Sequence, residues 1–229
     1  MSLEDYQSYL QWLEEALDNH DCKLHAYVLM TNHVHLLLMP KKAGLVPWRM
    51  MSLGRRNVQY INRTYHRAGT LWDSRYQSSI VHADSYLLTC PRYIELNPVR
   101  AAMVDDSAHY RWSSYHHNAW GLPEARLTPH YVYDARAASD SVRQAAYRAL
   151  FRAELDADAI DDIRLALNQN QALGSNRFHT KIEKKLGERR AARPRGRPSV
   201  ATLGWGRMLQ QSCRDRGDYC LENNRRCPL

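Results

Sequence analysis

The chain has 229 residues, 44% of them hydrophobic, which is enough for one full hydrophobic core with additions around it. No stretch approaches the roughly 18 consecutive apolar residues of a membrane-spanning helix. The first residues, including Glu4 and Asp5, lack the basic and then apolar pattern of a signal peptide. These features argue against a membrane protein, and we expect a cytoplasmic location.

Five cysteines, an odd number without paired C-x-x-C spacing, argue against a disulfide framework and fit a reducing compartment. Cys213, Cys220 and Cys227 recur every seven residues, but no nearby histidine pattern completes a tetrahedral zinc site. We therefore do not expect zinc.

The formal net charge of +8 is concentrated near the C-terminus. From Gly174 onward the chain carries 14 Lys and Arg against 5 Asp and Glu, so the preceding part is close to neutral. A basic segment beside a neutral body is typical of proteins that hold nucleic-acid phosphates. A tail that only improves solubility is the alternative reading.

The predicted elements of the first half alternate between helix and strand. Apolar residues at spacings of three and four predict a helix over residues 3–17. The following elements are a β-hairpin over 22–30 and 34–39, a helix over 47–66, a strand over 75–81, and a helical stretch capped by Asp84 that ends at Asn97-Pro98. This order predicts an α+β fold, with helices packed on a mostly antiparallel sheet.

Beyond residue 120 the character of the sequence changes. Alanine-rich segments over 139–155 and 158–168 predict helices, and Ser175 is the expected cap of a third. From residue 188 the chain is rich in Arg, Pro and Gly, and we expect it to be disordered. The predicted divisions are a main domain over 1–120, a helical extension over 121–187 and a basic tail over 188–229.

Two histidines on the second arm of the hairpin form the motif H-V-H. Side chains alternate along a strand, so His33 and His35 share a face while Val34 points to the other. Two imidazoles presented together suit a divalent metal, although two ligands alone make a weak site. The ordinary alternative is a structural pair of histidines.

The segment R-Y-I-E-L-N-P-V-R-A contains Tyr93 and, four residues later, Asn97. In a helix these two residues share a face, so Asn97 could supply an oxygen ligand beside the tyrosine. A phenol is a poor nucleophile at neutral pH and needs a polarised phosphate to react. On the residues alone, the favoured reading is that Tyr93 is one of fourteen tyrosines that pack the protein interior.

Four sequence runs occur together in one order. They are Y-V-L-M-T-N-H-V-H-L-L-L over 27–38, G-T-L-W-D-S-R-Y over 69–76, R-Y-I-E-L-N-P-V-R-A over 92–101 and W-S-S-Y over 112–115. Together they closely resemble the REP-associated tyrosine transposases, relatives of single-tyrosine insertion-sequence transposases, over about residues 3–186. The combination is more specific than any single run.

The resemblance implies a ferredoxin-like HUH domain over residues 1–120 that binds Mg²⁺ or Mn²⁺. It implies a metal-dependent enzyme that cuts and rejoins single-stranded DNA at REP-type hairpins through a 5′-phosphotyrosyl intermediate. By position, the metal ligands fall on His33, His35 and Asn97, and the nucleophile on Tyr93. It also implies a prokaryotic, nucleoid-associated protein that works as a monomer or a homodimer.

The basic tail contains R-P-R-G-R-P, which resembles an AT-hook. In that motif an extended Arg-Gly-Arg lies in a narrow A·T minor groove, here through Arg195, Gly196 and Arg197. A plain Arg and Pro linker is the alternative. The tail is therefore a second predicted DNA-binding element, directed at A/T-rich duplex.

The relatives begin with a strand before their first helix, whereas this sequence begins at the helix. In a ferredoxin-like sheet that first strand lies beside the histidine strand. We therefore expect the histidine strand to have an unpaired edge. This expectation leaves a second hypothesis open, that of an inactive transposase relative that binds DNA without cutting it. A metallohydrolase without a covalent intermediate is a third, weaker hypothesis, because no H-E-x-x-H helix accompanies the histidines.

Overall fold

The computed structural model describes residues 1–17, 22–42, 45–82, 86–187 and 219–225. The strands are β1 (Cys22–Leu29), β2 (His33–Pro40), β3 (Gln77–Val81) and β4 (Tyr219–Arg225). The helices before residue 120 are α1 (Leu3–Leu17), α2 (Leu45–Thr64), α4 (Thr89–Glu95), α5 (Asn97–Arg100), the 3-10 helix η1 (Ser107–His109) and α6 (Tyr115–Trp120). The later helices are α7 (Tyr131–Asp134), α8 (Asp140–Leu150), α9 (Ala157–Gln169) and α10 (Asn176–Leu186).

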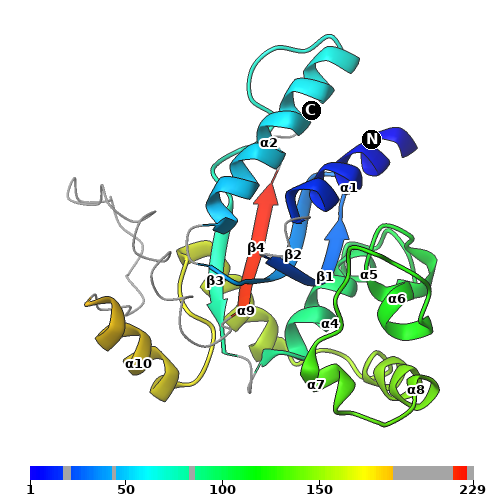
Figure 1. Cartoon of the computed structure of the whole chain (residues 1–229), viewed down its shortest axis with the longest axis vertical. Helices are drawn as coiled ribbons and strands as arrows, with labels where there is room; N and C mark the ends of the chain where they lie inside the picture. Colours follow the sequence, from blue (N-terminus) through cyan, green and yellow to red (C-terminus); the bar gives the residue numbers. More distant parts are fainter. Residues whose placement is uncertain (18–21, 43–44, 83–85, 188–218, 226–229) are drawn as a thin grey trace.

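The four strands form one antiparallel sheet with the order β1-β2-β4-β3. Helices α1 and α2 pack against each other above one face, whereas α4 and α9 contact the sheet from the other (Figure 1). The predicted α+β fold with helices on an antiparallel sheet is confirmed. Among the described residues, no helix is long and apolar enough to cross a membrane.

Strand β4 gives the sheet a strand pairing that the sequence did not predict. It pairs with β2 on one side and β3 on the other, so β2 lies inside the sheet between β1 and β4. The prediction of an unpaired edge on the histidine strand is therefore wrong. Residues 219–225, within the segment expected to be disordered, form the strand that pairs with the backbone of β2.

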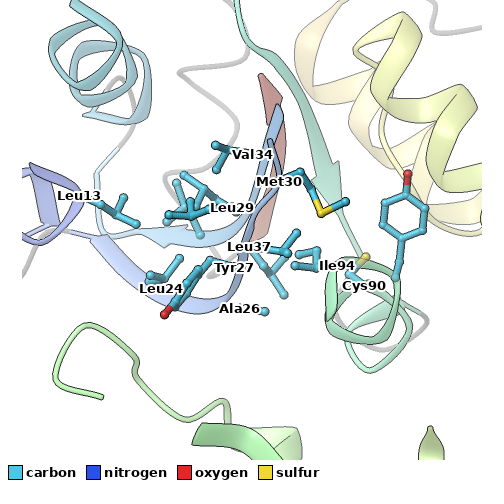
Figure 2. Close-up of a cluster of buried hydrophobic side chains, with 14 of the residues drawn as sticks. Leu13, Leu24, Ala26, Tyr27, Leu29, Met30, Val34, Leu37, Cys90 and Ile94 are labelled. Carbon is cyan, nitrogen blue, oxygen red and sulfur yellow. The ribbon is translucent and has the colours of Figure 1, made fainter. Parts of the chain in front are cut away.

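Alternation along β2 distributes its side chains between two layers. Figure 2 shows Leu13 of α1 on one side of the sheet and Ile94 of α4 on the other, with Leu37 of β2 facing Ile94. Leu37 and Ile94 are fully buried, which stabilises each by about 1.5–3 kcal/mol relative to exposure. This apolar contact fixes α4 on the same sheet face as the histidines.

The helices beyond residue 120 do not form a separate unit. Ile163, Ala166 and Leu167 of α9 are buried in the same core as the sheet. Helix α9, which belongs to the predicted helical extension, covers the sheet where β3 and β4 lie. The cap predicted for the third helix is confirmed, since the hydroxyl of Ser175 accepts a hydrogen bond from the backbone N–H of Phe178 in α10.

Candidate active site at the histidine strand and the tyrosine helix

His33 and His35 lie on β2 with their rings side by side. Their ring centroids are 4.9 Å apart, and the ring planes are 80° apart. His35 is 2% exposed, whereas His33, the first residue of the strand, is half-buried. Val34 between them is buried, as the strand alternation predicts. The strand therefore presents two imidazoles together at its beginning.

Asn32 orients the first of these rings. The Nδ1–H of His33 donates a hydrogen bond to Oδ1 of Asn32 at 2.7 Å. A ring that donates through Nδ1 keeps its lone pair on Nε2, which is the arrangement of a metal-binding histidine held by a polar neighbour. The residue before the H-V-H motif therefore orients the ring of His33.

Helix α4 brings Tyr93 to these histidines. The rings of His35 and Tyr93 are 5.5 Å apart at 73°, edge to face. Tyr93 is 6% exposed, and its neighbours Cys90 and Ile94 are fully buried under the sheet. Pro91 occupies the first turn of α4, where its missing N–H costs no helical hydrogen bond. The helix that carries the tyrosine is therefore firmly packed.

The helical path continues from Tyr93 into α5. Leu96 joins the two helices, because its N–H bonds to the carbonyl of Arg92 and its own carbonyl accepts from Arg100. Asn97 and Arg100 thus follow Tyr93 at helical spacings of four and seven residues. Asn97 is half-buried and lies on the Tyr93 side of this helical path. The ring contacts join His33, His35 and Tyr93. The amide of Asn97 takes no part in these contacts.

Arg100 holds Tyr93 from two directions. Its Cζ lies 4.4 Å from the centre of the tyrosine ring, and its guanidinium donates to the carbonyl oxygen of Tyr93 at 2.6 Å. Burial lowers the pKa of Arg100, although the side chain remains charged at neutral pH. A fixed positive charge is therefore present beside Tyr93.

Glu95 ties α4 to the segment that follows. It is fully buried and accepts hydrogen bonds from Ser114 Oγ at 2.5 Å, Asn118 Nδ2 at 2.8 Å and the Tyr147 hydroxyl at 2.8 Å. Burial raises the pKa of Glu95 to about 7, and the three hydrogen bonds act in the opposite direction. The Oγ of Ser114 also accepts from the N–H of Tyr27 in β1 at 3.0 Å. The network therefore fixes α4 relative to β1.

The sequence did not predict a role in this site for three residues, Arg100, Glu95 and Ser114. Arg100 had a visible signal, because seven residues after Tyr93 is the same face of a helix. Glu95 and Ser114 stand within two of the co-occurring runs, but the spacing of the runs gave no indication of the hydrogen bond between them.

Three other tyrosines have structural partners. The hydroxyl of Tyr86 donates to Asp162 at 2.8 Å, and that of Tyr110 donates to the carbonyl of Leu29 at 2.6 Å. Tyr115 packs with Phe151 in a small second hydrophobic cluster. None of the three lies in ring contact with the histidines, so Tyr93 is the tyrosine that the fold brings to His35.

Within the described residues, no group of three or more His, Cys, Asp or Glu side chains could hold a metal. The assignment of a metal to His33, His35 and the amide of Asn97 therefore stays a prediction. The orientation of His33 by Asn32 fits such a role, and open positions would remain for phosphate oxygens. The hook-like residues Arg195, Gly196 and Arg197 lie outside the described residues, so their role stays a prediction.

Residues 2–97 of the chain match a known protein family. It is the family described as "Transposase IS200 like". The matched region runs from the start of α1 to Asn97, so it contains both histidines and Tyr93. No curated protein and no solved structure gives a match. The match supports a DNA-processing transposase and leaves its finer type open.

Proposed function

We propose that this protein is a metal-dependent single-tyrosine DNA transposase that cleaves and rejoins single-stranded DNA through a 5′-phosphotyrosyl intermediate. The observation that carries the proposal is the convergence of His33, His35 and Tyr93, from two elements far apart in the sequence, on one face of the sheet. The family match over residues 2–97 supports it independently of the geometry.

Tyr93 is the proposed nucleophile. Its phenolic oxygen attacks the phosphorus of the scissile phosphodiester, and the bond from phosphorus to the 3′-oxygen breaks. The DNA 5′-phosphate becomes bonded to Tyr93, and the 3′-oxygen leaves as a hydroxyl with a proton. The energy of the broken bond is kept in the new phosphodiester, so the reverse reaction can rejoin DNA without an external energy source.

Arg100 and the two histidines have separate roles in the proposed reaction. The guanidinium of Arg100 offsets negative charge next to the tyrosine ring and holds the backbone of Tyr93 in place. His33, His35 and Asn97 would hold Mg²⁺ or Mn²⁺, whose chemistry is to polarise the scissile phosphate. The hydrogen bond to Asn32 orients the ring of His33.

The proposed substrate is single-stranded DNA beside a REP-type hairpin, as in the REP-associated tyrosine transposases that the sequence runs resemble. The basic C-terminal segment supports nucleic-acid binding, because each phosphate contact releases condensed counterions. For this substrate we propose a location with the prokaryotic nucleoid, in the cytoplasm.

The test uses the purified full chain, a hairpin-forming single-stranded oligonucleotide labelled at its 3′ end, and Mg²⁺ or Mn²⁺. The wild type should form a covalent adduct that survives denaturing electrophoresis, and Tyr93→Phe should abolish it. Tyr86→Phe is the matched control, because it removes a tyrosine hydroxyl bonded to Asp162 outside the site. An adduct that persists in Tyr93→Phe would overturn the assignment of the nucleophile. Binding without an adduct would instead favour an inactive DNA-binding relative.

A further inference from the structure

Helix α2 belongs to a stretch of the chain that contains no acidic residue. Between Asp21 and Asp73 the sequence carries eight Lys and Arg residues and no Asp or Glu. Four of the eight lie in α2, namely Arg49, Arg55, Arg56 and Arg63. The part of the chain before the basic tail is therefore neutral only as a sum, because this helix carries positive charge alone.

The four arginines of α2 fall into two pairs. Arg49 and Arg56 bond to groups of α1, so both are held between the two helices. Arg55 and Arg63 are exposed, and within the described part of the chain neither forms an ion pair. The positive charge that α2 presents to solvent is thus not offset by a described carboxylate.

The exposed arginines share one side of α2 with an aromatic and an amide side chain. The buried residues of the helix recur at spacings of three and four between Val46 and Ile61, so they occupy one side. The opposite side, here called the solvent face of α2, carries the exposed residues Trp48, Arg55, Gln59 and Arg63. The indole of Trp48 is 73% exposed, which is unusual for so large an apolar group.

Trp48 also lines a groove between α1 and α2. The groove has a volume of about 360 Å³, and its lining includes Trp12, Glu15, Trp48, Arg49, Ser52 and Arg56. The carboxylate of Glu15 is paired with Arg56, so the one acidic group of the groove is neutralised. This volume lies within the range of roughly 300–1,000 Å³ that is usual for sites of small ligands. The groove can therefore hold a flat aromatic group beside the exposed indole.

We propose that the solvent face of α2 and the groove beside it bind single-stranded DNA, with an unpaired base stacked on Trp48 and phosphates held by Arg55 and Arg63. Proteins that bind single strands combine positive charge along the backbone with aromatic side chains that stack on bases. The face offers both and has no acidic residue of its own. A second copy of the chain would bring the same arginines against one another, so the charge favours a polyanion.

Helix α2 leads towards the end of the sheet at which the histidines lie. Directly after the helix, the hydroxyl of Tyr65 donates to Asp5 in the first turn of α1 at 2.7 Å. Figure 1 shows the second half of α2 rising past the tip of β4, and the backbone at this tip pairs with His33. A single strand that follows the solvent face of α2 therefore reaches the end of the sheet from which Tyr93 is approached. The inference rests on the proposed function, because it assigns a second contact with the same substrate.

The proposal is tested by DNA binding, independently of cleavage. Full-length Tyr93→Phe protein is the parent, and the probes are a hairpin with a single-stranded extension and the same hairpin without it. On the extended probe, the double variant Arg55→Gln/Arg63→Gln should lower the slope of log affinity against log salt by about 1.4, the value for two phosphate contacts on a single strand. Trp48→Ala should weaken binding about tenfold without changing the slope, and Trp48→Phe should keep most of the affinity. On the hairpin alone, all variants should bind like the parent.

Two matched controls separate these effects from a general loss of charge or of exposed aromatic surface. Arg152→Gln/Arg177→Gln removes two exposed arginines from other parts of the chain, and Trp120→Ala removes an exposed tryptophan of α6. Both should bind like the parent. The inference is overturned if the α2 variants bind the extended probe no more weakly than these controls. Equal losses on both probes would assign the face to duplex DNA and would also overturn it.

Failure of this inference is distinguishable from failure of the proposed function. If the wild type forms its adduct while the α2 variants bind like the controls, only this inference fails. If the α2 variants lose affinity as expected but the wild type forms no adduct, the inference is supported and the proposed function fails. If the parent does not bind the extended probe, both fail.

Discussion

The ring of His35 lies edge to face with the ring of Tyr93, and the two centroids are 5.5 Å apart. One ring belongs to the second strand and the other to a short helix on the same sheet face. The contact exists because α4 is anchored twice, by apolar residues under the sheet and by the buried hydrogen bonds of Glu95. The geometry of the candidate site therefore depends on residues outside the ring contact itself.

Asn32→Ala should weaken metal binding without removing a ligand. The variant loses the acceptor that fixes His33 Nδ1–H, so the ring and its tautomer are less well defined. We expect the concentration of Mn²⁺ needed for half-maximal adduct formation to rise about tenfold, with a smaller change at saturating metal. The measurement is a metal titration of the adduct. An unchanged titration curve would show that Asn32 does not act on His33.

Arg100→Ala should slow adduct formation by about one to two orders of magnitude, because it removes a positive charge and a backbone tether beside Tyr93. Arg100→Lys keeps the charge but lacks the planar guanidinium, so it should recover only part of the rate. The assay is the rate of adduct formation at saturating DNA. Arg152→Ala, which changes an exposed arginine, is the control and should react like the wild type. Equal rates for all variants would contradict a role for Arg100.

The parts of this site that sequence predicts are those encoded by local periodicity. Strand alternation places His33 and His35 on one face, and helical spacing places Asn97 and Arg100 after Tyr93. Local patterns give no indication of which distant segments meet. The bonds from Glu95 to Ser114 and Tyr147 join residues far apart in the chain, so they became visible only in the folded structure.

Glu95→Gln should change the pH dependence of stability. The pKa of Glu95 is raised by burial from its ordinary value of 4.5 to about 7, so the folded protein holds a proton that the unfolded chain has lost. The stability that Glu95 contributes is fully present below about pH 4.5 and is lost as pH rises towards 7. Glutamine resembles the protonated carboxyl, so the variant should gain on the order of 2 kcal/mol relative to wild type between about pH 5 and pH 8.

Urea unfolding of both proteins at the two pH values measures this difference. Burial lowers the pKa of His25 to about 4 and that of His130 to about 3, and these groups give stability slopes of the opposite sign. Because both histidines are present in both proteins, their effects cancel in the comparison. A stability difference that does not vary with pH would contradict the raised pKa of the Glu95 carboxyl.

Ser114→Ala should destabilise the fold by about 1–3 kcal/mol, because it leaves the buried Glu95 carboxyl and the Tyr27 N–H each without one partner. The free energy of unfolding is the measurement, and Ser52→Ala, at an exposed position of α2, is the control. Adduct formation should fall less than in Arg100→Ala, because Ser114 bonds to Glu95 whereas Arg100 contacts Tyr93 itself. A loss of stability no greater than in the control would contradict this role.

Strand β4 marks the limit of prediction from the sequence. Tyr219, Cys220 and Leu221 are followed by Glu222, Asn223 and Asn224, so the segment lacks the regular alternation of apolar and polar residues that identifies a strand. Its structure comes from backbone pairing with β2 and β3 on both sides. A strand fixed by partners so distant in the chain has no local signature, which explains why the tail was predicted to be disordered throughout.

Peptide mapping of the covalent complex identifies the residue that carries the DNA. Covalent complex formed by the wild type is digested with nuclease and trypsin, and the modified peptide is sequenced by mass spectrometry. Cleavage after Arg92 and Arg100 releases an eight-residue peptide that begins at Tyr93. We expect a 5′-phosphonucleotide on Tyr93 in that peptide. A nucleotide on any other residue, or cleaved DNA without a modified peptide, would contradict it.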